Sequence, residues 1–88
     1  RIDCADTVKF DSMEKIRAHV LSRHDAADVN SIDGVRVRSG CGWWLIRASN
    51  TEAALVARAE AADQTALDRL LGDIETTLAA AGLDWKRP

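Results

Sequence analysis

The stretch VRVRSGCGWWLIRASNTEAALVARAEA, residues 35–61, determines the fold that we expect for this chain. Valine alternates with arginine over residues 35–38, which predicts a strand with one buried face and one exposed face. Apolar runs over residues 43–46 and 54–61 predict two more strands, and the glycine-rich segment 39–42 predicts a tight turn. Because tight turns join antiparallel neighbours, the stretch predicts a meander of three strands with its two adjacent tryptophans on opposite faces.

Short strands are expected beyond the meander as well. Residues 1–5 alternate polar and apolar side chains, as a half-buried strand does. Residues 28–32 also have the pattern of a short strand, and the dipeptide Asp33-Gly34 that follows is typical of a hairpin turn. We therefore expect the segment 28–32 to pair with the first strand of the meander.

Two amphipathic helices are predicted, because apolar residues recur at helical spacing in two other segments. In the first helix, Asp11 and Glu14 have the spacing of a capping box. In the second helix, Asp63 or Thr65 can cap the start, and Gly82 can provide the left-handed residue that ends it. The apolar stripes are Met13, Ile16, Val20 and Leu21 in the first helix, and Leu67, Leu70, Leu71, Ile74, Leu78 and Ala81 in the second.

These elements predict an α+β fold, a two-layer sandwich of two helices on a mainly antiparallel sheet of about four strands. The length of 88 residues suits one domain with its own core. The net charge of −2, from 12 basic and 14 acidic residues, argues against a nucleic-acid or acidic-membrane surface. No apolar run approaches the roughly 20 residues that span a bilayer. We therefore expect neither nucleic acid nor a membrane as a partner.

The segment Arg47-Ala48-Ser49-Asn50-Thr51-Glu52 joins two predicted strands and carries the clearest functional signal. A guanidinium can meet two phosphate oxygens at once, and Ser49 and Thr51 add hydroxyl donors. Asn50 tolerates left-handed backbone angles, which would let successive N–H groups form an anion nest. The same residue types also make ordinary turns. The residues alone leave a phosphate site and a plain turn open.

Other reactive side chains give weaker signals. Arg58 has two open interpretations, a solvated arginine on a strand face or support for an anion held by the loop. Cys4 and Cys41 lack metal-ligand spacing, so we expect free thiols in a reducing compartment. His19 and His24 are five residues apart, which places them on different helix faces and excludes a metal pair. We therefore expect no catalytic residue and no metal ligand in this chain.

The runs at residues 33–37, 42–43, 47–52 and 58–61 together resemble the C-terminal domain of the α-D-phosphohexomutases. Among these enzymes the resemblance is closest to bacterial phosphomannomutase/phosphoglucomutase, and it covers nearly the whole chain. It implies a domain, residues 1–88, of a four-domain cytoplasmic enzyme, similar in fold to one half of the TATA-binding protein. A chain that begins with Arg1 rather than Met fits this interpretation.

The resemblance also implies what the domain does. The enzymes move a phosphoryl group between the 1- and 6-positions of mannose or glucose phosphate, and the C-terminal domain binds the sugar's phosphate. Arg47, Ser49, Asn50 and Thr51 match the phosphate-binding loop, and Arg58 matches a basic position in the following strand. The partners implied are the phosphosugar and the enzyme's other domains, which hold the Mg²⁺ and the phosphoserine.

The chain departs from the family pattern at two positions of the loop, and one alternative function stays open. The family often has proline where this chain has Ala48 and Ala53, so the loop lacks that source of rigidity. Without cofactors of its own, the isolated domain is expected to be inactive. The alternative is a free-standing anion-binding or protein-interaction module without catalysis.

Overall fold

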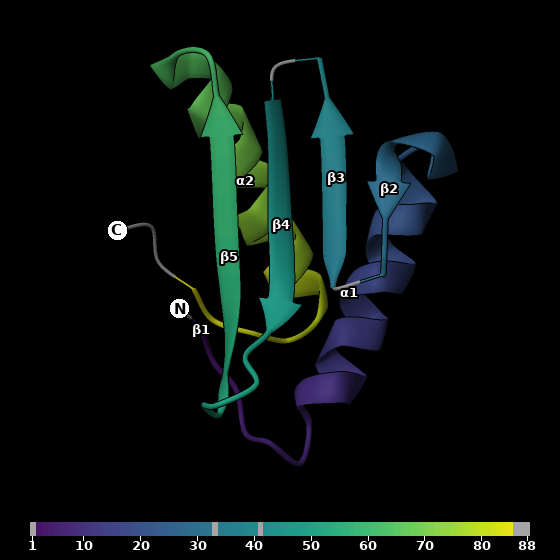
Figure 1. The fold of residues 1–88 in the computed structure, drawn as a ribbon, viewed down its shortest axis with the longest axis vertical. Helices are drawn as coiled ribbons and strands as arrows, with labels where there is room; N and C mark the ends of the chain where they lie inside the picture. The colour runs from purple at the N-terminus through teal and green to yellow at the C-terminus, as the bar shows by residue number, and fades with distance from the viewer. Residues whose placement is uncertain (1, 33, 41, 86–88) are drawn as a thin grey trace.

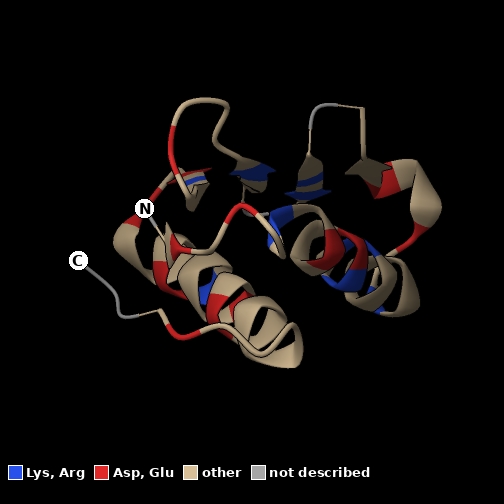
Figure 2. Ribbon diagram, turned by 90° about the horizontal axis from the view of Figure 1, so that it is seen from below, with Lys and Arg blue, Asp and Glu red and all other residues tan. Residues whose placement is uncertain are grey.

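Two helices lie against one face of an antiparallel sheet in the computed structural model, which describes residues 2–32, 34–40 and 42–85 (Figure 1). Figure 2 looks from below, with the sheet above and the helices side by side beneath it. The elements are β1 (Ile2–Asp3), α1 (Lys9–Arg23), the short 3₁₀ helix η1 (Ala26–Asp28), β2 (Val29–Asn30), β3 (Val35–Ser39), β4 (Gly42–Ala48), β5 (Ala54–Ala61) and α2 (Gln64–Ala80).

The sheet has the order β1-β5-β4-β3-β2, and every neighbouring pair is antiparallel. The predicted α+β class and the central meander are confirmed. The sheet has five strands in the described part of the chain rather than about four, because both short edge strands pair. Among the described residues, the predicted strand at residues 1–5 is reduced to Ile2–Asp3. The predicted strand at residues 28–32 is reduced to Val29–Asn30, and Asp28 belongs to η1.

The register of the meander gives the sheet a covered face and an open face. Over residues 35–38 the valines are buried and the arginines exposed, as predicted. Trp44 is fully buried opposite Ala59, whereas Trp43 lies half-buried on the open face beneath the guanidinium of Arg36, 4.7 Å from the ring centroid. The loop at residues 49–53 therefore leaves a sheet with one apolar face and one face that carries arginines.

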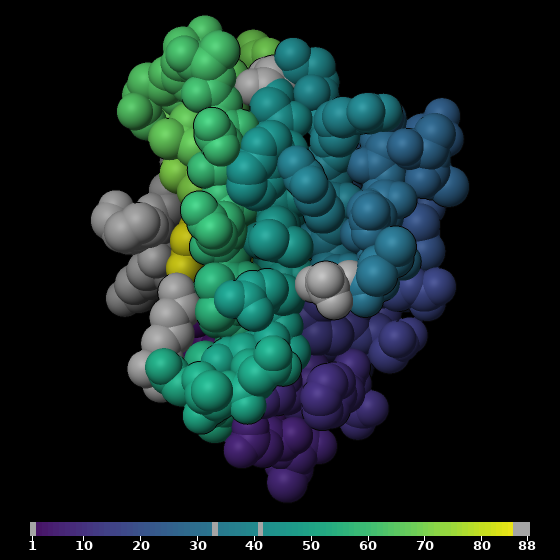
Figure 3. Space-filling view, viewed as in Figure 1, coloured from purple at the N-terminus to yellow at the C-terminus, as the bar shows by residue number. Residues whose placement is uncertain are grey.

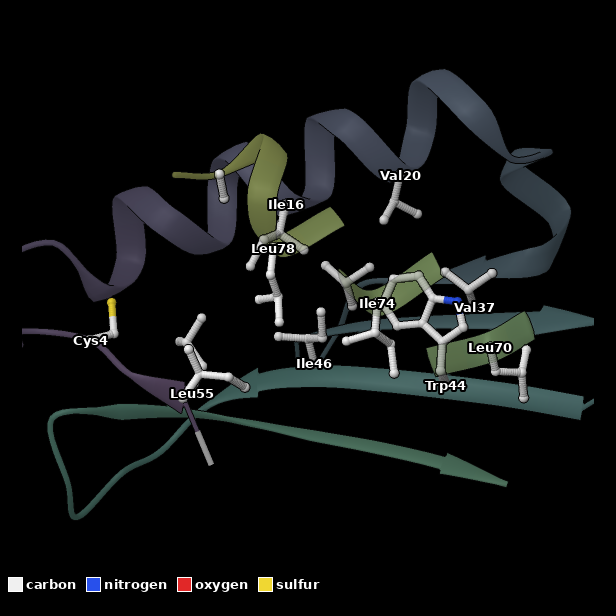
Figure 4. Close-up of a cluster of buried hydrophobic side chains, with 13 residues drawn as sticks. Cys4, Ile16, Val20, Val37, Trp44, Ile46, Leu55, Leu70, Ile74 and Leu78 are labelled. Atoms are coloured by element: carbon white, nitrogen blue, oxygen red, sulfur yellow. The ribbon is translucent and has the colours of Figure 1, made fainter. Parts of the chain in front are cut away.

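The core lies between the covered face and the two helices (Figure 4). Its buried members are Ile2, Cys4, Ile16, Val20, Val35, Val37, Trp44, Ile46, Leu55, Leu70, Ile74, Leu78 and Ala81. The indole N–H of Trp44 donates to Asp73 Oδ2 at 2.8 Å, and His24 Nε2 lies 3.1 Å from the same oxygen. Because a buried polar group needs a partner, this cluster fixes β4 against α2 and the end of α1.

The two helix starts differ in how well the sequence predicted them. α1 begins at Lys9 after Val8 and has no side-chain cap, so the capping box predicted at Asp11 and Glu14 is wrong. Asp11 lies inside the first turn, where its side chain cannot serve as the N-cap. In α2, by contrast, the Asp63 carboxylate accepts from the N–H of Ala66 at 2.8 Å, which confirms one of the two predicted caps.

The end of α2 has the predicted form. Gly82 has a φ of 79°, and its N–H donates to the Ala79 carbonyl at 3.0 Å. The N–H of Leu83 donates to the Leu78 carbonyl at 2.9 Å, which completes a Schellman motif. Of the cysteines, Cys4 is a buried free thiol, and Cys41 lies outside the described residues, as does Asp33 of the predicted hairpin turn.

Candidate functional site

The predicted phosphate loop connects β4 to β5 at one end of the sheet. Arg47 lies next to last in β4, opposite Val56, and its exposed side chain is on the open face. The connecting residues are 49–53, and the N–H of Ser49 donates to the Ala54 carbonyl at 2.9 Å, which closes the loop. Figure 3 shows this loop, in teal-green, against the purple N-terminal segment.

Ser49 organises the turn from within. Its Oγ accepts the N–H of Thr51 at 3.3 Å and the N–H of Glu52 at 3.2 Å. The expected anion nest is not formed, because the described residues with positive φ are all glycines and Asn50 is therefore not left-handed. The hydroxyl takes the two N–H groups that a nest would have offered, which is the local competition typical of serine turns.

A hollow of about 530 Å³ lies beside the loop. β4 and the loop contribute Arg47, Ala48 and Asn50 to its lining, α1 contributes Phe10, Met13, Glu14 and Arg17, and the β2–β3 connection and the start of β3 contribute Ser31, Gly34 and Val35. Arg17 lies 3.6 Å from the Glu14 carboxylate, whereas Arg47 has no acidic partner among the residues that the structure describes. The Arg47 guanidinium therefore remains available to an anion from solution.

The β2–β3 connection is pressed directly against the base of Arg47. A Cβ atom at Gly34 would lie 2.7 Å from Arg47 Cβ and 2.6 Å from the Ile46 carbonyl oxygen. Only glycine permits this approach without displacement, and Gly34 also has a φ of 107°. The glycine of the predicted hairpin signal thus allows the β2–β3 connection to lie next to Arg47, the arginine of the candidate site.

Four side chains of this region carry hydrogen-bond donors that a single ligand could use. Arg47 has its guanidinium and Asn50 its amide, and both residues line the hollow. Ser49 Oγ acts as an acceptor within the turn, so its own hydrogen can still be donated outward. Thr51 is exposed in the same turn and adds a second hydroxyl. Such a set suits a ligand with several acceptor oxygens and negative charge.

Arg58 lies apart from this group. It is exposed on the open face of β5, opposite Leu45, and the described residues that line the hollow do not include it. Because Arg47 pairs with Val56, Arg58 is its diagonal neighbour, at a typical separation of about 7–8 Å. Of the predicted site residues, Arg47 and Asn50 line the hollow, whereas Ser49, Thr51 and Arg58 are not among its described lining residues. Ser49 and Thr51 belong to the same turn as Asn50, and Arg58 lies on the following strand.

Sequence reasoning missed Lys9, the first residue of α1. Its side chain is buried, and its Nζ donates to the Ser49 carbonyl at 2.7 Å and the Glu52 carbonyl at 3.2 Å. It also contacts Asp6 Oδ1 at 3.0 Å. A lysine in the first turn of a helix is ordinarily solvated, and these partners lie 40 and 43 residues away. No local pattern could have identified it.

Other kinds of site have less support. Within residues 2–32, 34–40 and 42–85, no group of three or more His, Cys, Asp or Glu is placed to hold a metal ion. The helices in the same part of the chain lack the length and hydropathy needed to cross a membrane. The loop is therefore the site on which a functional interpretation can be built.

Comparison with known proteins identifies the family. Residues 1–77 match the family described as phosphoglucomutase/phosphomannomutase, C-terminal domain, and the chain belongs to this family. This confirms the resemblance on which the sequence interpretation relied. The family consists of domains of phosphosugar mutases, and the relatives of this chain are named accordingly.

Three relatives show how much of a longer protein is represented. A phosphomannomutase/phosphoglucomutase of Pseudomonas syringae pv. tomato is 37% identical over 87 residues, which are 99% of this chain and 18% of the relative. A probable phosphoglucosamine mutase of Methanocella arvoryzae is 40% identical over 68 residues, 77% of this chain and 15% of the relative. The structure of a phosphoglucomutase/phosphomannomutase family protein from Burkholderia thailandensis matches with a TM-score of 0.70 and 34% identity, covering 88% of this chain and 18% of that one. The chain spans less than a fifth of the length of these relatives.

Proposed function

We propose that this chain is the C-terminal, phosphate-binding domain of a phosphohexomutase of the phosphomannomutase/phosphoglucomutase type. In this proposal residues 47–51 hold the phosphate of a mannose or glucose phosphate while a phosphoryl group moves between the sugar's 1- and 6-positions. The observation that carries the proposal is the Arg47 guanidinium, which lines a hollow with Asn50 and lacks an acidic partner in the described part of the chain.

The donors of the loop suit a phosphate that is bound but not transferred. A charged fork and neutral O–H and N–H groups recognise a tetrahedral dianion without attacking it. Binding energy from such a non-reacting group can orient the substrate at a distant reacting centre. The domain would therefore contribute substrate binding and leave bond breaking to other parts of a longer polypeptide.

The Mg²⁺ and the phosphoserine that the family implies fit that division. Among the described residues no group of three or more His, Cys, Asp or Glu is placed to hold a metal ion, and the proposal assigns the magnesium site to another domain. Magnesium would neutralise charge on a transferring phosphoryl group elsewhere in the enzyme. We accordingly expect the isolated chain to bind phosphosugar without mutase activity.

Arg58 has a smaller part in this proposal. As a diagonal neighbour of Arg47 it adds positive charge near the loop, but it belongs to β5 and not to the turn at residues 49–52. Its side chain is exposed, so solvent and salt weaken its effect on an anion at the loop. We propose support for binding through charge, and assign direct contact to Arg47, Ser49, Asn50 and Thr51.

Calorimetric titration of the 88-residue chain with glucose 6-phosphate tests the proposal. The Arg47→Ala variant should bind about ten- to a hundredfold more weakly, because a hydrogen bond to a charged group is lost. Binding should also weaken below about pH 6, where a phosphate monoester loses its second negative charge.

The matched control is Arg38→Ala, on the same face of the sheet but 3.6 Å from the Asp28 carboxylate. It should bind the phosphosugar as the unsubstituted chain does, and unphosphorylated glucose should not bind. Equal affinity of the Arg47→Ala variant and the unsubstituted chain would contradict the proposal.

A further inference from the structure

Lys9 is an unusual lysine, because its side chain is only 9% exposed yet every N–H of its ammonium group has a partner. An ammonium group has three donors and no acceptor. The three donors correspond to the three acceptors already described, the carbonyls of Ser49 and Glu52 and the carboxylate of Asp6. A buried charge is tolerated when it is paired in this way.

The two carbonyls belong to the first and last residues of one turn, 49–52. A single nitrogen atom that binds both of them fixes the distance between the ends of the turn. Ser49 Oγ fixes the same turn from within, through the N–H groups of Thr51 and Glu52. These bonds add to the one from the Ser49 N–H to the Ala54 carbonyl, and those from Lys9 come from a helix far away in the sequence.

The position of Lys9 separates it from the ligand groups. The described residues that line the hollow beside Arg47 do not include Lys9, although its neighbour Phe10 does line it. The carbonyl oxygens of Ser49 and Glu52 face the buried ammonium, so their partial negative charges are drawn toward α1. An anion at the loop would otherwise be repelled by any carbonyl oxygen that turned toward it.

We infer that Lys9 is a positioning residue for phosphate binding. It holds residues 49–52 in the conformation that presents Arg47 and the loop donors together, and its charge lies behind the loop. This inference rests on the proposed function of the loop. Preorganised donors bind more tightly because the chain does not have to be ordered on binding, and a charge shielded from water acts more strongly than an exposed one.

A substitution of Asp6 can show whether Lys9 acts by positioning the loop or only by forming an ion pair with Asp6. Its side chain is 73% exposed, whereas that of Lys9 is 9% exposed, so the carboxylate contact is the more screened of the three. If Lys9 acted only through this ion pair, Lys9→Met and Asp6→Asn would have the same effect. If Lys9 positions the loop, the Asp6→Asn variant should retain phosphate binding, because the carbonyl contacts remain and a nearby negative charge is removed.

The test is a titration of the 88-residue chain with inorganic phosphate, followed by residue-resolved NMR. We expect Lys9→Met to bind phosphate at least about tenfold more weakly and to shift the amide signals of residues 49–52. Asp6→Asn should bind at least as tightly as the unsubstituted chain, and Lys9→Arg should recover most of the affinity, because a guanidinium can also donate to carbonyls. Lys15→Met is the matched control, since it removes an exposed lysine from the same helix and should change the affinity by less than about twofold.

Several results would overturn the inference. Binding that is lost in Arg47→Ala but unchanged in a folded Lys9→Met variant contradicts the role of Lys9 and leaves the proposed function standing. Absence of phosphate binding by the unsubstituted chain contradicts both. If Lys9→Met does not fold, the ammonium signal of Lys9 in the unsubstituted chain decides the question. That signal should shift together with the amides of residues 49–52 as phosphate is added, and a signal that stays in place contradicts the inference.

Discussion

The two ends of β4 are built in different ways. At the first end β3 stops at Ser39, β4 begins at Gly42, and these two residues pair with each other. At the other end residues 49–53 leave the sheet, and their carbonyls are held by Lys9 and by the N–H of Cys4, which donates to Ala53 at 2.9 Å. The first connection closes through the pair Ser39–Gly42 of its own hairpin. The second has a closing bond from Ser49 to Ala54 as well, and it is also held by residues at least forty positions away.

If the proposed function is correct, this difference separates a connection that serves stability from one that serves binding. A hairpin that closes on itself gains its geometry from its own residues, and its loss disturbs the sheet. A loop that depends on a helix and an edge strand can change conformation while the sheet remains. Binding residues are commonly carried by loops on a rigid scaffold, and the proposed function assigns that role to the loop at residues 49–53.

The largest effect on stability is expected at the first end, from Gly42→Ala. A Cβ atom there would lie only 2.1 Å from the Glu60 carbonyl oxygen and 3.0 Å from Ala61 Cα, and the φ of 149° adds strain. We expect the free energy of unfolding to fall by about 3 kcal/mol in chemical denaturation. Gly40→Ala is the control, because a Cβ there meets nothing within 4 Å, and it should be nearly neutral. If Gly42→Ala and Gly40→Ala lowered the free energy of unfolding equally, the close packing at Gly42 would not be what stabilises this end of β4.

A smaller effect is expected at the second end, from Ser49→Ala. The change leaves the N–H groups of Thr51 and Glu52 without their acceptor. Because these groups are exposed and water can replace the hydroxyl, the unfolding free energy should fall by only about 1 kcal/mol. Phosphate binding should weaken more than stability does, which parallel denaturation and titration would measure. A fall in stability with unchanged phosphate affinity would mean that Ser49 only shapes the turn.

The smallest effect is expected from Arg58→Gln, which removes charge beside the loop but no assigned contact. Affinity for phosphate should fall about twofold at low salt, and the difference should vanish at about 1 M salt, where exposed charges are screened over a few ångströms. Titrations at the two salt concentrations check this. A loss as large as that in Arg47→Ala, retained at high salt, would instead place Arg58 in direct contact with the anion.

The sequence predicted those features that depend on neighbouring residues. The alternation over residues 35–38 fixed the faces of β3, and the cap at Asp63 and the glycine at Gly82 bounded α2. The lengths of β1 and β2 were overestimated, because edge strands persist only as far as a partner pairs with them. The cap and the glycine act within a few residues, whereas the length of β1 depends on pairing with β5, far away in the sequence.

The candidate site was predicted only in part, because some of its features depend on neighbouring residues and others on the tertiary fold. Residue types and a family pattern pointed to Arg47 and Asn50, which the fold brings into one hollow. The backbone conformation was not predictable, because Ser49 Oγ captures the N–H groups that a left-handed Asn50 would have turned outward. Lys9 was missed because its role exists only once α1 packs beside the loop.

The central claim is that residues 47–52 bind a phosphate dianion, and a map of NMR chemical-shift changes during titration with glucose 6-phosphate tests it most directly. The claim predicts saturable shifts confined to the Arg47 guanidinium and to residues near the loop, with the start of β4 at Gly42 and the far end of β5 unmoved. Saturable shifts centred on Trp43 and Arg38, or none at the loop at millimolar ligand, would contradict it.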